Sequence, residues 1–160
     1  MSEKINEIAY CGLYCAECPS HSGVLADLAR DLRKELRTYR YDKVSQALAE
    51  ISFFKDFKNY ETCYRVLGLL VKMRCGHVCR EGGGNPMCSI RKCCEKKGIS
   101  GCWECNEFDA CEKFTFLQKA HGDAMKKNIS KIKRKGIDEF LAGQKYWYVK
   151  PKEENKERNR

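Results

Sequence analysis

Twelve cysteines in a chain of 160 residues are the feature that most constrains how this sequence can fold. Eleven of them fall in three short stretches, CGLYCAEC, CGHVCREGGGNPMCSIRKCC and CWECNEFDAC, and Cys63 stands apart in a helical pattern. The pairs Cys15/Cys18 and Cys102/Cys105 have the C-x-x-C spacing that lets one tight turn direct two sulfurs at one ion. The sequence therefore predicts loops whose conformation is fixed by bound metal.

The same cysteines indicate the cellular compartment. The first ten residues lack the charged and then apolar arrangement of a signal peptide, and no apolar run approaches the roughly 18 residues of a membrane span. We therefore expect a cytoplasmic protein without membrane contact. Because the cytosol keeps thiols reduced, this location favours metal-bound thiolates over a disulfide framework.

The positive net charge has two explanations. With every cysteine counted as neutral, 31 Lys and Arg against 22 Asp and Glu leave a formal charge of +9. Metal ligands are deprotonated, so four thiolates around one Zn²⁺ sum to −2, and two such sites would lower the net charge to about +5. Much of the basic excess can thus offset thiolate charge. A basic surface for nucleic acid or an acidic protein partner is the alternative.

The spacing of apolar residues predicts helices and almost no strand. The first four expected helices cover residues 24–36 after a cap at Ser20 or Ser22, 43–54, 60–73, and 89–97 before Gly98. Asp109 is expected to cap a fifth helix that ends at Gly122, and Asp123 to cap a sixth that is broken at Gly136. The side chains expected to face inward are Val44, Ala47, Leu48, Ile51, Tyr64, Leu67, Leu70, Val71, Met125, Ile129 and Ile132. Cys63 is predicted to be buried as a small hydrophobic residue.

The fold class that follows is mainly α, a small helical domain with irregular cysteine-rich metal-binding loops. We expect residues 1–149 to form this single domain. Residues 150–160 have no apolar side chain and are predicted to be a disordered charged tail.

The spacing of the cysteines leaves the identity of the metal open. Paired turns drawn from distant segments are typical of tetrahedral zinc sites. Spacings of two and three residues, as in Cys11-x3-Cys15-x2-Cys18, also occur around four-iron clusters. We expect two structural Zn²⁺ sites, and the alternative is a 4Fe-4S cluster in a redox or sensor protein. Cys93 and Cys94 are adjacent, so their side chains would diverge by about 100° on a helix and would not form a simple pair.

No catalytic motif is evident in the chain. Gly82–Gly84 are followed by Asn-Pro rather than by Lys and Ser or Thr, which argues against a phosphate-binding loop. His77 could replace a cysteine as a ligand, or act as a base for Cys79. We expect a macromolecular binding or adaptor module rather than an enzyme. Trp103, His77 and the basic stretch KKNISKIKRK at residues 126–135 are its candidate surfaces.

The motifs YCGLYCAECP, CSIRKC, KKGISGCWEC and KNISKIKRKGIDEFLAGQ resemble a small cysteine-rich prokaryotic family, catalogued as domain of unknown function 3795 and assumed to bind zinc. The resemblance runs from about Ile8 to Gln144. It implies metal ligation by Cys11, Cys15, Cys18, Cys75, Cys79, Cys88, Cys93, Cys102, Cys105 and Cys111. Cys63 and Cys94 lie outside the family pattern, and Cys75-x3-Cys79 is one residue longer than the usual pair. The resemblance implies no activity.

Overall fold

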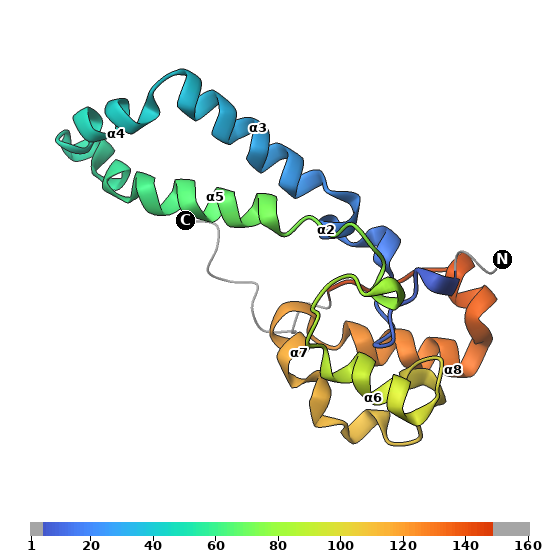
Figure 1. Cartoon of the computed structure of the whole chain (residues 1–160). Coiled ribbons are helices and arrows are strands. Elements are labelled where there is room, and N and C mark those ends of the chain that lie inside the picture. Colours follow the sequence, from blue (N-terminus) through green and yellow to red (C-terminus); the bar gives the residue numbers. More distant parts are fainter. Residues whose placement is uncertain (1–4, 149–160) are drawn as a thin grey trace. The chain divides into compact units, whose positions relative to one another are not determined.

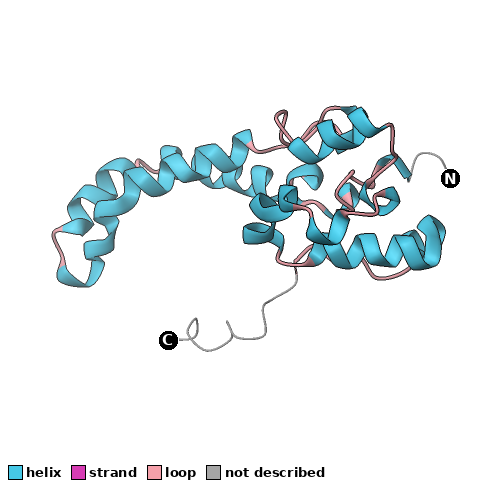
Figure 2. Ribbon diagram, turned by 90° about the horizontal axis from the view of Figure 1, so that it is seen from below, coloured by secondary structure: helices cyan, strands magenta, loops and turns pink. Residues whose placement is uncertain are grey.

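Helices dominate residues 5–148, which are the residues that the computed structural model describes. Figure 2 shows these helices joined by loops, as the apolar spacing predicted. The described residues form no strand, and an isolated antiparallel bridge pairs Ile8 with Tyr14. None of the described helices is both long enough and apolar enough to cross a membrane. The predicted tail at 150–160 lies outside the described residues.

The chain divides into two compact units. The cysteine unit comprises residues 5–18 and 76–148 of the described chain, and the helical unit comprises Pro19–Cys75. The single-domain organisation expected for residues 1–149 stays a prediction.

The helical unit is built around two helices that lie side by side (Figure 1). Its elements are α2 (Pro19–Ser22), α3 (Val24–Thr38), α4 (Tyr41–Ala49), the 3-10 helix η2 (Ser52–Asn59) and α5 (Tyr60–Lys72). Small residues are buried where α3 packs on α5, namely Ala26, Ala29 and Gly68. The Arg33 guanidinium covers Gly68 and lies 4.4 Å from the centre of the Tyr64 ring.

Two boundaries in the helical unit differ from the prediction. Gly23, with a φ of 75°, precedes α3, and Ser22 ends α2 instead of capping α3. The helix expected over 43–54 ends at Ala49 and is followed by η2, whereas α5 matches the helix expected over 60–73.

The inward faces predicted for the helical unit are partly wrong. Val44 is 37% exposed and Ile51 49%, and Ala47 is also exposed. Cys63, predicted to be buried, is exposed as well. The residue that α4 buries is Ser45, next to Val44, so the buried face of this helix is not the apolar face that the spacing predicted.

The cysteine unit consists of short helices linked by loops. Its elements are η1 (Cys15–Glu17), η3 (Cys79–Glu81), α6 (Ser89–Lys97), η4 (Cys102–Glu104), η5 (Phe108–Ala110), η6 (Glu112–Phe114), α7 (Thr115–His121) and α8 (Ala124–Ala142). Helix α6 has its predicted bounds and ends at Gly98, whose φ of 63° only glycine adopts readily. Asp109 lies inside η5, so its predicted role as a helix cap is wrong. Asp123 precedes α8, and Gly136 interrupts that helix with a φ of 83°, as predicted.

Helix α8 supplies the centre of the core in the cysteine unit. Met125, Ile129 and Ile132 are buried as predicted, and they pack with Ile8, Ile90 and Phe114. Gly12, with a φ of 82°, brings the first cysteine loop against this helix, where a Cβ would lie 3.0 Å from Ile129 Cγ1. Only glycine combines this backbone conformation with so close an approach.

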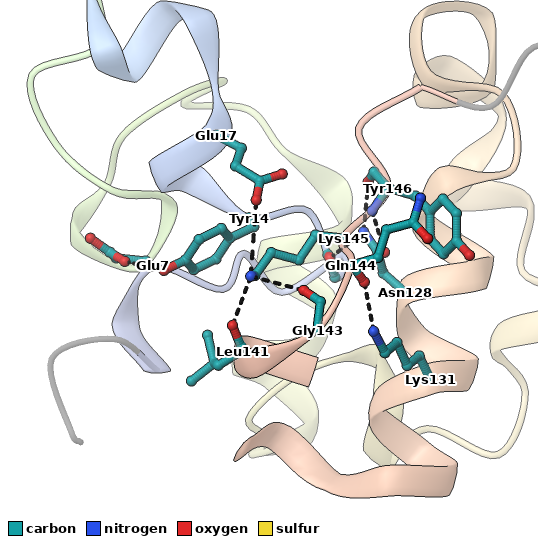
Figure 3. Close-up of polar contacts among 11 residues, drawn as sticks. Glu7, Tyr14, Glu17, Asn128, Lys131, Leu141, Gly143, Gln144, Lys145 and Tyr146 are labelled. Atoms are coloured by element: carbon teal, nitrogen blue, oxygen red, sulfur yellow. Dashed lines mark hydrogen bonds and ion pairs between the residues drawn. The ribbon is translucent and has the colours of Figure 1, made fainter. Parts of the chain in front are cut away.

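The fully buried Asn128 joins three parts of this core. Its amide nitrogen donates to the Gly12 carbonyl at 2.9 Å and to the Tyr146 carbonyl at 2.7 Å, and its Oδ1 accepts from the Tyr146 amide at 2.9 Å. Figure 3 shows Asn128 beside the segment that carries Tyr146. One side chain of α8 thus pairs backbone groups of the first cysteine loop and of the C-terminal segment.

Lys145 makes a second connection between the same segments (Figure 3). Its side chain is 12% exposed, lies over the Tyr14 ring at 5.0 Å, and donates to the Leu141 carbonyl at 2.7 Å. The Tyr14 hydroxyl donates to Glu7 at 2.7 Å, and this bond raises the pKa of Tyr14 to about 12. The loop that begins the cysteine pattern is therefore held from both sides.

We predict that Asn128→Ala destabilises the cysteine unit by about 2–4 kcal/mol, because it leaves the buried Gly12 carbonyl and two partly buried backbone groups of Tyr146 without partners. The measurement is urea denaturation of the purified full-length protein. Asn106→Ala removes an exposed amide and is the matched control, with an expected change within about 0.5 kcal/mol. Equal losses in both variants would contradict the role assigned to Asn128.

Candidate metal centres

Both C-x-x-C motifs form the tight turns that their spacing predicts. Cys15 and Cys102 each begin a 3-10 helix, and the second cysteine of each pair donates its backbone N–H to the carbonyl of the first. These distances are 2.9 Å for Cys18 to Cys15 and 3.1 Å for Cys105 to Cys102. Each turn is held by this local hydrogen bond and carries two thiols.

Five cysteines line one cavity of about 470 Å³ in the cysteine unit. They are Cys93, Cys94, Cys102, Cys105 and Cys111, supplied by α6, by η4 with the residue after it, and by the residue that follows η5. The Cys94 and Cys102 sulfurs lie 3.7 Å apart, and Lys97 Nζ lies 3.7 Å from the Cys105 sulfur. Ile90, Phe108 and Phe114 complete an apolar wall. We call these five residues the first thiol group.

A second thiol group gathers around the buried Cys11. It comprises Cys11, Cys15, Cys79 and Cys88, since the other three act electrostatically on the Cys11 thiol. Cys11 acts in the same way on Cys102 of the first thiol group. Cys88 stands at the start of α6. The Cys102 amide donates to the Tyr10 carbonyl at 2.9 Å, which places the first cysteine loop beside η4. The two groups are therefore neighbours in one unit.

Basic side chains lie among these thiols. Arg91 is 8% exposed and donates to the Cys79 and Gly83 carbonyls, both at 2.9 Å. Arg80 lies over the Tyr10 ring at 4.6 Å and the Trp103 ring at 5.6 Å, and it donates to backbone carbonyls. Among the described residues neither guanidinium forms an ion pair with a carboxylate. Their positive charges are thus available to thiolates.

The pKa values of the thiols depend on their burial and on neighbouring thiols. Burial raises the pKa of Cys11 to about 12, and it raises the pKa of Cys79 against the opposing effect of Arg91. The hydrogen bond between Cys94 and Cys102 lowers the pKa of Cys94 and raises that of Cys102. Without metal, the Cys11 and Cys102 thiols would be protonated at neutral pH, so a metal ion must displace their protons to bind.

The cysteine sulfurs are suitable ligands for zinc, although they are not yet arranged as a complete coordination sphere. Among residues 5–148 no three His, Cys, Asp or Glu side chains are grouped as ready ligands. With Zn–S distances near 2.3 Å, the sulfurs of a tetrahedral site lie about 3.8 Å apart, close to the 3.7 Å between Cys94 and Cys102. In a four-iron cluster each cysteine binds a different iron, so the ligand sulfurs stand farther apart.

The two groups contain eight of the ten cysteines expected as ligands. Cys18 is half-buried at the end of η1 and belongs to neither group. Cys75 belongs to the helical unit, where its amide donates to the Ser20 carbonyl at 2.9 Å. The His77 side chain is 73% exposed and lies 3.9 Å from the Glu81 carboxylate.

Cys94 is the candidate that the sequence pattern missed. It is 1% exposed, whereas its neighbour Cys93 is half-buried. The available signal was helical phase, because Cys94 follows the buried Ile90 by four residues and so shares its face of α6. A family pattern that names Cys93 does not contain this information.

We predict that thiol labelling will distinguish Cys63 from the grouped cysteines. In the native protein a maleimide reagent should modify the exposed Cys63 first, and Cys11, Cys94 and Cys102 only after unfolding. Mass spectrometry of peptides after timed labelling measures the order. Cys63→Ser should abolish the fast phase. If Cys94 reacted as fast as Cys63, the burial described here would be wrong.

Comparison with known proteins identifies a family without assigning a function. Residues 7–116 match the family described as Protein of unknown function (DUF3795). This range includes every cysteine of the chain, and it confirms the resemblance seen in the motifs. No curated protein and no solved structure matches the chain.

Proposed function

The chain belongs to the DUF3795 family, and we propose that it is a metal-binding protein in which two zinc ions hold the cysteine unit together. The observation that carries this proposal is the cavity lined by five cysteines, in which two sulfurs already lie at the spacing of a tetrahedral zinc site. Zinc would supply a four-way crosslink between short helices that are linked by loops.

The first proposed site takes Cys94, Cys102, Cys105 and Cys111 as ligands. Cys102 and Cys105 come from one tight turn, which is the pair that structural zinc sites use most. Cys94 is chosen over Cys93 because it is buried and contacts Cys102. This assignment departs from the family pattern at that one position.

The second proposed site takes Cys11, Cys15, Cys79 and Cys88. These residues come from the first cysteine loop, the start of η3 and the residue before α6. A zinc ion here would link the N-terminal loop to the middle of the sequence. The two sites use seven of the ten expected ligands together with Cys94, and Cys18, Cys75 and Cys93 are not assigned to either site.

The distribution of positive charge supports thiolate ligands. Each site of four thiolates and one Zn²⁺ carries a net charge of −2. Arg91 hydrogen-bonds near Cys79 and its charge favours the Cys79 thiolate, while Lys97 lies 3.7 Å from the Cys105 sulfur. These contacts offset charge that would otherwise be costly in a partly buried site.

Metal analysis tests the proposal directly. Protein purified without oxygen should contain about two zinc ions per chain and no acid-labile sulfide. Cys102→Ser should lower the zinc content to about one, because it removes a ligand of the first site, and the Cys63→Ser control should keep two. Iron with matching sulfide, and absorption near 400 nm, would contradict zinc and support the alternative iron–sulfur redox or sensor protein.

Metal removal should unfold the cysteine unit. Structural zinc contributes roughly 10–16 kcal/mol of apparent binding free energy in small model peptides, and that energy is lost on chelation. We expect circular dichroism to show reduced helix content and a lower melting temperature after chelation, both restored by added zinc. A spectrum and melting curve unchanged by complete metal removal would contradict a structural role.

A further inference from the structure

A basic groove follows α8 on the cysteine unit, outside both thiol groups. Its volume is about 600 Å³. It is lined by five cations, Lys126, Lys127, Lys131, Arg134 and Lys135, and by the carboxylate of Asp123. Ser130 and Gln144 add hydrogen-bonding groups, and Tyr146 adds an aromatic ring. The groove therefore has a strong excess of positive charge.

Most of this charge is not neutralised within the protein. Lys126 donates to the Asp109 carbonyl at 2.6 Å and Lys131 to the Gln144 carbonyl at 2.7 Å, but carbonyls do not cancel a charge. In the described part of the chain, Lys135 alone among the five forms an ion pair, with Glu139 at 2.5 Å. An anionic ligand would gain four cations without first breaking a salt bridge.

Tyr146 is held in place at this groove. Its backbone N–H and carbonyl are both bonded to the buried Asn128, and Lys127 Nζ lies 5.6 Å from the centre of its ring. Figure 3 shows Tyr146 next to Gln144, whose carbonyl receives Lys131. The ring is partly buried against the core of the cysteine unit, so it loses little conformational entropy when a flat group stacks on it.

We propose that the α8 groove binds single-stranded nucleic acid. Its cations contact the phosphates, and Tyr146 stacks on a base. This combination of a positive groove and an aromatic platform is the one that single-strand binding proteins use. No aliphatic side chain lines the groove. An acidic protein partner is therefore the poorer match, because protein interfaces depend on apolar and aromatic anchors at their centre.

The test is fluorescence anisotropy with the full-length, zinc-loaded protein at 50 mM salt. The probes are a labelled 12-nucleotide single-stranded RNA of mixed sequence, the matching DNA strand and its duplex. We expect both single strands to bind more tightly than the duplex. For about four phosphate contacts, the logarithm of the binding constant should fall with the logarithm of salt with a slope near −3.

Two variants connect the binding to the groove. Lys127→Gln/Arg134→Gln removes two cations that donate no hydrogen bond within the described residues, and it should weaken binding by about 10- to 100-fold. Lys55→Gln/Lys58→Gln removes the same charge from the helical unit and should change binding little. Tyr146→Leu keeps the backbone bonds to Asn128 and should weaken single-strand binding by roughly 5- to 150-fold.

Zinc content and circular dichroism, measured on each variant, distinguish failure of this proposal from failure of the proposed zinc sites. A protein that is folded and contains zinc but does not bind RNA would overturn the groove assignment alone. Equal losses in the groove and control variants, or tighter binding of duplex, would also overturn it. So would binding of poly-glutamate as tightly as RNA with no effect of Tyr146→Leu, which would indicate an acidic protein partner.

Discussion

The cysteine unit depends on keeping the first cysteine loop against α8. That loop is short, and its backbone polar groups have to find partners after they leave water. The Asn128 side-chain amide donates a hydrogen bond to the Gly12 carbonyl, and it also bonds the backbone N–H and carbonyl of Tyr146. Because the same side chain satisfies both segments, the position of the cysteine loop and that of the C-terminal segment are coupled. The loop that would hold one metal ion and the ring at the basic groove thus share a single support.

Crowded thiols impose a second constraint. Burial disfavours thiolates, as the raised pKa of Cys11 shows, yet metal binding requires them. The protein places cations where they reduce this conflict, with Arg91 beside Cys79 and Lys97 beside Cys105. In the absence of carboxylate partners for Arg80 and Arg91 within the described residues, this arrangement is better suited to thiolate–metal ligation than to a core of neutral thiols. The basic side chains near the cysteines contact thiols and backbone carbonyls, whereas those along α8 line a groove outside both thiol groups.

The helical unit follows a different packing rule. Its two long helices meet through Ala26, Ala29 and Gly68, which allow a close approach but bury little apolar area. Leu28 consequently remains 63% exposed on α3 although its spacing is that of a core residue. Apolar periodicity predicts which faces of a helix are hydrophobic, but the number of neighbouring helices decides whether such a face is covered.

Local sequence determined the elements of this protein, and tertiary structure decided which of them meet. The bounds of α6, the end of that helix at Gly98, the break at Gly136 and the two C-x-x-C turns depend on contacts within a few residues, so the sequence alone predicted them. The exposure of Cys63 and the role of Asn128 were decided by the tertiary structure, since Asn128 bonds a carbonyl 116 positions away in the chain. Cys94 lies eight positions from Cys102, so helical phase alone could have favoured it over Cys93. Spacing specifies how one segment presents its side chains, whereas the partition of thiols into two groups requires the three-dimensional packing of segments up to a hundred residues apart.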